Sequence, residues 1–338
     1  MTDRVQSPAW NAAGAPSISV IVPTHDRAAF LPELIASLET QTLDPAHFEV
    51  VVVDDASTDE TWEVLRRLAS ATPLRMLSAR ADGNRGPAAA RNLAVSLARA
   101  QAFAFTDDDC LPTPGWLVAI ADGLHEADVV QGRTLPRTSE QAAAGPWART
   151  VWITAATQLY ETCNIGWRRE TFERLRGFAA GRPDAPPGTR AHFGEDAELG
   201  WRLIADGGTT AYRPAALVHH RVHPGTFADW LAERRRLRLF PDLVRRAPGL
   251  RRAMRLRIFL SWDTALFDLA LAGGIAGLIS RKPWPALAAL PWVAARWRQA
   301  GRKPGRSRLT RLAQLAAGDA VGLVSLVSGS LRSRRAVL

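Results

Sequence analysis

Short apolar runs alternate with amphipathic stretches through the first third of the chain. Each run has four to six residues and is rich in Val, Ile, Leu or Phe, a pattern that predicts a buried β-strand. The predicted strands cover residues 17–22, 49–53, 74–77 and 102–106. Helical spacing of apolar residues and helix-capping residues predict helices over residues 28–40, 57–70, 86–100 and 115–125. This alternation predicts an α/β fold, with a mainly parallel sheet covered by helices on both faces.

Polar residues cluster where three of the predicted strands end. The three clusters occupy residues 24–27, 54–55 and 107–109. Ligands of open α/β sheets bind beyond the carboxyl ends of the strands. We therefore expect the three clusters to line one rim of the sheet.

Three consecutive aspartates, Asp107, Asp108 and Asp109, form the third cluster. Neighbouring carboxylates repel one another, and a divalent cation with phosphate oxygens would supply the missing positive charge. In an extended chain Asp107 and Asp109 lie on the same side. The alternative interpretation is a solvated acidic turn or a cap for the following helix, and by itself the short motif favours that alternative.

The composition narrows the class of protein. With 47% hydrophobic and 22% charged residues, the chain is neither wholly disordered nor a coiled-coil rod. Its two cysteines, Cys110 and Cys163, are too few for a disulfide scaffold or a four-cysteine zinc site. The first 16 residues contain no continuous apolar stretch, so no secretory signal is visible. We expect residues 1–16 to be a disordered extension.

Charge is distributed unevenly along the 338 residues. Residues 227–338 contain 22 Lys and Arg against 6 Asp and Glu, whereas residues 1–226 contain 21 against 27. This difference predicts an α/β domain over residues 17–226 and a basic helical region over residues 227–338. A basic, apolar region is typical of binding to an anionic membrane surface. No base-stacking pattern or recognition helix accompanies the arginines, so no nucleic-acid partner is expected.

Seven motifs in order resemble the nucleotide-sugar glycosyltransferases of family 2, which have the GT-A fold. They extend over about residues 17–222, and the ordered set is far more specific than any single motif. The motifs read PTHDR, VVVDDASTDE, NRGPAAARNLA, FTDDDCLPTPGWL, CNIGWRRETFERLRGF, HFGEDAELGWRLIADGG and PAALVHH. The resemblance implies transfer of a sugar from a nucleotide-diphosphate donor with inversion at the anomeric carbon.

The resemblance also implies a set of donor-binding residues. Asp55 would hydrogen-bond the nucleotide base, and Arg91 would face the diphosphate or the ribose. His25 stands where the family often has Tyr, and Asp26 stands where it often has Asn. The full set of implied donor contacts is Pro23, Thr24, His25, Asp55, Arg91, Asp107 and Asp108.

A divalent cation, Mn²⁺ or Mg²⁺, is implied as the cofactor. Asp107 and Asp109 correspond to the family's D-x-D pair, and Asp109 is the expected direct ligand. His220 stands where many members place another contact to the metal or the diphosphate, and His219 is the alternative.

Asp196 is the expected general base, and Glu195 would bind the acceptor or exchange roles with it. An inverting transferase must remove the proton of the acceptor hydroxyl as that hydroxyl attacks, and a carboxylate within hydrogen-bond reach can do so. The alternative interpretation is that Glu195, Asp196 and Glu198 only complement the N-terminal dipole of a helix over residues 195–206. The Gln-x-x-Arg-Trp signature of processive synthases is absent, which favours transfer of a single sugar.

Two apolar stretches, residues 258–280 and 309–331, lie in the basic region. Each is long enough to span a bilayer, but Asp263, Asp268 and Asp319 would each cost about 2.5–3.5 kcal/mol near its centre. If the two stretches formed a spanning hairpin, the arginines between them would lie on the opposite side of the membrane from the arginines that flank the hairpin. The positive-inside rule therefore gives no orientation. Helices lying in the cytoplasmic leaflet are therefore favoured over spanning helices. A helical subdomain or a dimer contact is the remaining alternative.

The sequence therefore predicts an inverting, metal-dependent glycosyltransferase at the cytoplasmic face of the cell membrane. Its acceptor would be a lipid-linked or cell-envelope glycan. Donor and acceptor specificity are expected in loops such as residues 131–160 and 180–192. A protein of the same fold that binds nucleotide sugars or membranes without catalysis is the alternative.

Overall fold

The computed structural model describes residues 3–141, 145–179, 193–301 and 307–338. Within them the chain forms two compact units, and each is described separately. Unit 1 comprises Met1–Ala143 and Thr150–Val222, and unit 2 comprises Ala144–Arg149 and His223–Leu338.

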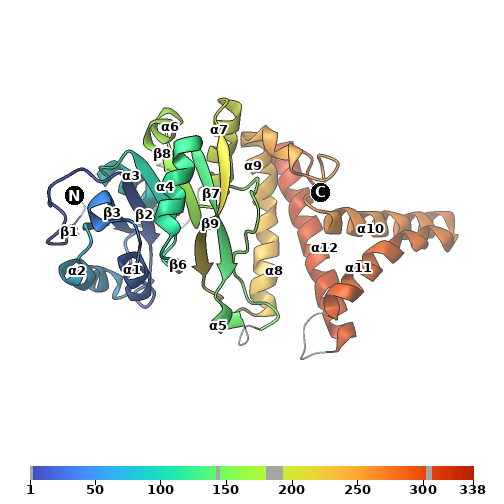
Figure 1. The fold of residues 1–338 in the computed structure, drawn as a ribbon. Helices are drawn as coiled ribbons and strands as arrows, with labels where there is room; N and C mark the ends of the chain where they lie inside the picture. The colour runs from blue at the N-terminus through green and yellow to red at the C-terminus, as the bar shows by residue number, and fades with distance from the viewer. Residues whose placement is uncertain (1–2, 142–144, 180–192, 302–306) are drawn as a thin grey trace. The chain divides into compact units, whose positions relative to one another are not determined.

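Unit 1 is built on a mixed sheet whose strand order is β1-β4-β3-β2-β5-β8-β7-β9-β6 (Figure 1). Strands β2, β3, β4 and β5 are mutually parallel, as the alternation of strands and helices predicts. Antiparallel pairing of β8 with β5 and with β7 then extends the sheet. The strands are β1 Arg4–Gln6, β2 Ile18–Thr24, β3 Phe48–Asp54, β4 Met76–Arg80, β5 Ala102–Thr106, β6 Cys110–Pro112, β7 Val129–Pro136, β8 Asn164–Arg168 and β9 Thr210–His220.

Helices cover both faces of this sheet, which confirms the α/β fold. Side chains of β2 and β3 alternate between the faces, so Val20 and Val50 pack with α1, α2 and α4, whereas Ile21 and Val51 pack with α3, α6 and α7. The helices of unit 1 are α1 Leu31–Glu39, α2 Thr61–Ala71, α3 Pro87–Leu97, α4 Trp116–Glu126, α5 Thr138–Gln141, α6 Arg169–Arg174 and α7 Glu195–Ala205.

Residues 3–16 are ordered and pack on the sheet, contrary to the disorder expected for the N-terminal extension. Strand β1 pairs with β4 and forms one edge of the sheet, and Ser7 donates its hydroxyl to the carbonyl of Leu74 at 2.7 Å. Trp10 is 5% exposed and packs under the guanidinium of Arg99, 3.9 Å from the ring centroid. A three-residue strand and one buried aromatic residue give too little periodicity for a sequence pattern to show.

Unit 2 is helical. It also contains a short segment from the middle of the sequence, Ala144–Arg149, which we call the strip. The helices are α8 Phe227–Arg236, α9 Phe240–Arg246, α10 Trp262–Ser280, α11 Leu290–Ala300 and α12 Arg308–Ser333, with short 3₁₀ turns at Leu237–Leu239, Pro248–Arg252 and Trp284–Ala289 (η2, η3, η4). Trp147 in the strip packs on Phe227 and Trp230, with ring centroids 5.2 and 4.8 Å apart. Capping boxes fix the starts of α8 at Thr226 and of α10 at Ser261.

Helices α10 and α12 are both long and apolar enough to cross a membrane, by length and composition. They differ in burial, because the tested window of α12 is 39% buried and that of α10 is 0% buried. Helix α12 packs closely on the η2 turn and α8: a methyl group on Gly318 would touch the ring of Trp230, and one on Gly329 would touch the backbone of Arg238.

Candidate active site

Two aspartates at the end of β3 hold the following loop in place through hydrogen bonds. Asp54 accepts a hydrogen bond from the backbone N–H of Ser57 at 2.9 Å. Asp55 accepts from the N–H groups of Arg85 and Gly86 at 3.0 and 2.7 Å, and its burial raises the pKa of its carboxyl group. Gly86 has a φ of +88°, which lets the backbone turn into α3 at this point. Asp55 therefore holds the loop before α3 against the end of β3.

The predicted wall of the base pocket lies at the end of β2. Pro23 and Thr24 are buried at the end of the strand, and half-exposed His25 follows them. His25 Nε2 lies 2.9 Å from the side-chain amide of Asn84 and 3.3 Å from a carboxylate oxygen of Asp26. The structure thus adds Asn84, the first residue of the NRGPAAARNLA motif, to this group.

The three consecutive aspartates have different surroundings. Asp107 Oδ1 lies 2.6 Å from Arg91 Nη2. Asp108 is buried, and burial, reinforced by its two neighbouring carboxylates, raises its pKa to about 7. Asp109 Oδ1 lies 3.5 Å from Nε2 of His220. The turn therefore points its carboxylates at separate partners and is not simply solvated.

Asp109, Cys110 and His220 form a group that could hold a metal ion, with one potential ligand atom from each residue within 4.8 Å of the others. Pairing of β6 with β9 places Cys110 opposite His220, and it places Leu111 opposite His219. Successive strand residues point to opposite faces, so this register brings His220, and not His219, beside Asp109.

The donor chemistry of this group fits a divalent cation. His220 Nδ1 lies 2.8 Å from the carbonyl oxygen of Arg221, so this nitrogen carries the proton and Nε2 is left as a ligand. Burial raises the pKa of the Cys110 thiol well above its usual range, so the thiol is a weaker ligand than the other two groups. An imidazole beside a carboxylate suits Mn²⁺ better than Mg²⁺, which prefers oxygen ligands.

Glu195 and Asp196 begin helix α7. The left-handed backbone of Gly194, with φ of +73°, turns the chain into the helix. Asp196 Oδ1 accepts a hydrogen bond from the N–H of Ala197 at 2.8 Å. Burial of Asp196 and the adjacent Glu195 carboxylate raise its pKa to about 7, which suits a general base at neutral pH.

Arg91 joins the two acidic groups of the site. It is 5% exposed, and its guanidinium lies 2.6 Å from Asp107 and 3.6 Å from Glu195. The family resemblance implies that Arg91 faces the diphosphate or the ribose of the donor. In the structure its guanidinium pairs with one carboxylate in the turn after β5 and with one at the start of α7, so it links the two elements.

Two further residues contribute that sequence reasoning missed. Asn164, in the segment that resembles the acceptor side, is 1% exposed; it accepts from the indole of Trp116 and donates to the carbonyls of Arg133 and Ala216, each at 2.8 Å. Its role is to hold α4, β7 and β9 together. Glu161 lies near Asp196 and helps to raise its pKa. Of the predicted specificity loops, residues 180–192 lie outside the described residues.

Comparison with known proteins identifies the family. Residues 19–185 match the family model "Glycosyl transferase family 2". The chain is 37% identical over 228 residues to validoxylamine A glucosyltransferase of Streptomyces hygroscopicus subsp. limoneus, which covers 57% of this chain and 49% of the relative. It is 30% identical over 157 residues to poly(ribitol-phosphate) beta-N-acetylglucosaminyltransferase TarS of Staphylococcus aureus, which covers 43% and 27%. The chain thus spans half or less of the length of these curated relatives.

The fold is similar to a solved structure of the mannosyltransferase PcManGT from Pyrobaculum calidifontis in complex with GDP-Man and Mn²⁺. The TM-score is 0.53 at 21% identity, and the similarity covers 96% of this chain and 90% of the other. At this identity the similarity establishes the fold alone. Together with the family match, it shows that the chain belongs to glycosyl transferase family 2 and has the GT-A fold.

Proposed function

We propose that the chain is an inverting, divalent-metal-dependent glycosyltransferase that moves one sugar from a nucleotide-diphosphate sugar to an acceptor hydroxyl. The observation that carries this proposal is the position of Arg91. Its guanidinium contacts Asp107 in the donor-side turn and Glu195 beside the expected base, so both halves of the reaction meet at one residue.

Asp196 would remove the proton from the acceptor hydroxyl while that oxygen forms a bond to the anomeric carbon. The bond from the anomeric carbon to the donor phosphate oxygen breaks at the same time, and the nucleoside diphosphate leaves with its electron pair. Asp109 and His220 would hold the cation, and Asp107 would share its carboxylate between that cation and Arg91. The bound cation would neutralise charge on the leaving diphosphate.

Donor recognition is proposed at the ends of β2 and β3. Pro23, Thr24 and His25 would line the base pocket, Asp55 would accept a hydrogen bond from the base, and Asp108 would lie on the diphosphate side. The acceptor is proposed to be a lipid-linked or cell-envelope glycan at the cytoplasmic face of the membrane. This part of the proposal rests on the basic, apolar helices of unit 2.

A panel of UDP- and GDP-sugars, scored for donor hydrolysis with Mn²⁺, Mg²⁺ or a chelator, tests the proposal. We expect hydrolysis of one donor, loss of that hydrolysis with the chelator, and loss of Mn²⁺-dependent nucleotide binding in Asp109→Asn. Asp122→Asn is the matched control, because Asp122 is an exposed aspartate on α4. Equal diphosphate affinity with and without Mn²⁺ in both variants and wild type would remove the metal from the mechanism.

The alternative function is a scaffold that binds nucleotide sugars or membranes without transferring a sugar. Such a protein would bind one donor of the panel but release no sugar with any metal or acceptor. The pKa of about 7 at Asp196 favours the enzyme, because a scaffold has no need of a tuned base.

A further inference from the structure

Helix α10, the η4 turn and helix α11 form a hairpin, Trp262–Ala300, which we call the arm. Figure 1 shows its two limbs extending from α12 and meeting at the far end. Gly273 is the only buried residue of α10, and the space beside it is taken by the η4 turn. Leu269 and Leu278 are 50% and 81% exposed. They are nine residues apart, which at about 3.6 residues per turn places them on opposite sides of the helix.

Helix α12 is different, because only one of its sides is uncovered. Leu315 and Leu326 are buried against the other helices of unit 2, whereas Val324 and Leu331 are 68% and 76% exposed. One side of α12 is therefore covered by protein, although its exposed side also carries apolar side chains. A helix that is apolar on all sides is typical of a protein core or of a bilayer interior, and α10 is not in a core.

We propose that the arm inserts into the hydrocarbon of a lipid bilayer while α12 stays outside it. The inference rests on the membrane location proposed above, but not on the transfer chemistry. Helix α10 has 19 residues and a length of about 28 Å, close to the roughly 30 Å of a hydrocarbon core. Arg281 and Lys282 at the tip can therefore reach the polar region of the opposite leaflet.

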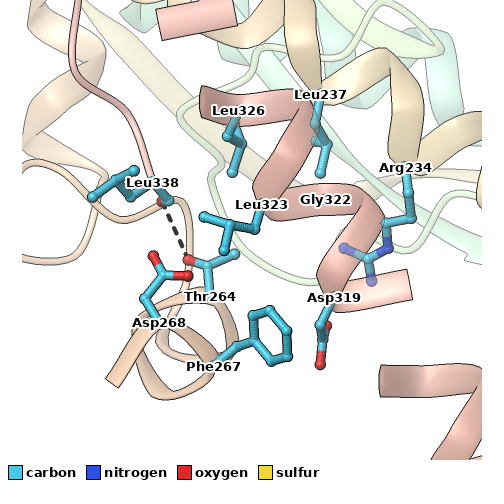
Figure 2. A pocket seen from close by; sticks show the side chains of 10 residues that line it. All are labelled: Arg234, Leu237, Thr264, Phe267, Asp268, Asp319, Gly322, Leu323, Leu326 and Leu338. Atoms are coloured by element: carbon cyan, nitrogen blue, oxygen red, sulfur yellow. Dashed lines mark hydrogen bonds between the residues drawn. The ribbon is translucent and has the colours of Figure 1, made fainter. Parts of the chain in front are cut away.

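The base of the arm is held to α12 by a buried ion pair. Arg296, 2% exposed, bonds both carboxylate oxygens of Asp319 at 2.6 and 2.8 Å and one oxygen of Asp263 at 2.9 Å. Thr264 Oγ1 also lies 3.3 Å from the carbonyl of Leu338, at a small cavity between α10 and α12 (Figure 2). Two of the aspartates expected to oppose insertion are thus paired at the base.

The hairpin also indicates which end of the arm faces the cytoplasm, which the sequence alone did not indicate. The return limb of α10 is η4–α11 and not α12, so the arginines after residue 290 come back to the base. Arg255 lies over Trp262 and Arg308 over Trp297, with 5.8 and 5.2 Å from guanidinium carbon to ring centroid. The tip carries two basic residues, Arg281 and Lys282, whereas the chain at the base carries more arginines, which suits the cytoplasmic headgroup layer. The base therefore faces the cytoplasm.

Two other surroundings of the arm, the headgroup layer and a second copy of the chain, fit these observations less well. A helix lying flat in the headgroup layer needs a polar side, and residues 269–279 of α10 contain no charged or polar side chain. A second copy of the chain would cover one side of the arm and leave the opposite side in water. Only lipid surrounds both limbs on all sides.

Depth-dependent fluorescence quenching tests the proposal with the full-length chain. Variants with one added cysteine, Leu271→Cys on the arm or Val324→Cys on α12, carry an environment-sensitive label on the exposed thiol, with the unsubstituted chain and its buried Cys110 and Cys163 as the labelling control. The labelled variants are mixed with phosphatidylcholine–phosphatidylglycerol vesicles. We expect the label at residue 271 to be quenched best by lipids with a mid-chain nitroxide, and the label at residue 324 to be unaffected by them. Quenching at residue 271 by headgroup nitroxides alone, or protection of that label in lipid-free dimers, would overturn the proposal.

A charge-insertion pair provides the second measurement. Leu271→Asp with Ile275→Asp should weaken retention on vesicles in high salt by more than about tenfold, since each carboxylate is costly in hydrocarbon. Val324→Asp with Leu331→Asp is the matched pair on α12 and should float with vesicles as wild type does. Equal retention of both pairs would show that the arm is outside the bilayer. Donor hydrolysis in detergent reports the transfer chemistry separately from either result.

Discussion

Arg91 contacts both acidic groups of the candidate site, so its effect extends beyond its own pair. Its positive charge lowers the pKa of Asp196, against the burial and the Glu195 carboxylate that raise it. The proposed base is therefore tuned by a residue that also pairs with the proposed donor-side turn. We therefore expect a substitution at Asp107 to change the pKa of Asp196 through this guanidinium.

Replacement of Asp196 by Asn should slow transfer by about 10²–10⁴-fold, because the amide cannot accept the acceptor proton. Nucleotide and metal binding should stay near wild type, and Glu195→Gln should cost less. Single-turnover transfer rates of the two variants check the assignment. A wild-type rate in Asp196→Asn with a slow Glu195→Gln would make Glu195 the base.

The same substitution has a predicted effect on stability. A folded-state pKa of about 7, above the ordinary value of 3.8, means that the folded protein holds a proton that the unfolded chain has released. The free energy of unfolding therefore falls as pH rises from about 4 to about 7. Asp196→Asn should be more stable than wild type at pH 8, with the difference vanishing below pH 4. Thermal unfolding across this range measures it; equal curves at pH 8 would place the pKa near its ordinary value.

Replacement of Arg91 by Gln should reduce the free energy of unfolding by about 3 kcal/mol, because it leaves Asp107 and Glu195 without a buried partner. It should also move the acid limb of the pH–rate profile to higher pH, because the charge that lowers the pKa of Asp196 is gone. Arg174→Gln, at an exposed pair with Asp206, is the control and should cost less than about 1 kcal/mol. An unshifted acid limb would separate Arg91 from the base.

At the scale of elements, the sequence predicted those strands and helices whose own apolar residues recur with a regular period. Strands β2, β3 and β5 and helices α2, α4 and α7 form within a few residues of their predicted positions, because each has an apolar pattern of its own. Strands β6 to β9 follow weaker patterns and depend on partners distant in the chain. The pairing of β6 with β9, which chooses His220 over His219, could not be read from either strand alone.

Strand β1 and Trp10 provide an element that can be tested. Trp10→Ala should lower the free energy of unfolding by about 3 kcal/mol, since a buried indole is removed. Trp152→Ala should change stability little, because Trp152 is 66% exposed. Chemical denaturation of both variants provides the comparison. An unchanged midpoint for Trp10→Ala would restore the expectation of a disordered N-terminus.

At the scale of the whole molecule, residues 1–226 carry a net charge of −6 and residues 227–338 carry +16. We therefore expect any attraction to anionic lipid to come from the basic region, where each Arg near a membrane surface would contribute about 1 kcal/mol. Burial of the arm in hydrocarbon is a separate contribution that salt does not screen. The two contributions should respond differently to ionic strength.

Raising the ionic strength should slow the initial binding of the protein to phosphatidylglycerol-containing vesicles, because screening shortens the reach of the attraction. The amount bound at equilibrium should change little. Stopped-flow energy transfer and flotation measure the two quantities, and vesicles of phosphatidylcholine alone serve as the control. Complete release at high salt would indicate that binding is electrostatic and that the arm contributes nothing.

The strip Ala144–Arg149 belongs to unit 2 although the chain on both sides of it belongs to unit 1. A module added at the end of a gene joins its host once, whereas this chain passes between the units after residues 143, 149 and 222. A cut after residue 222 removes Phe227 and Trp230 but leaves Trp147 behind without them. Chimaeras that exchange the basic region between relatives must therefore exchange the strip as well, or the aromatic contacts of Trp147 are lost.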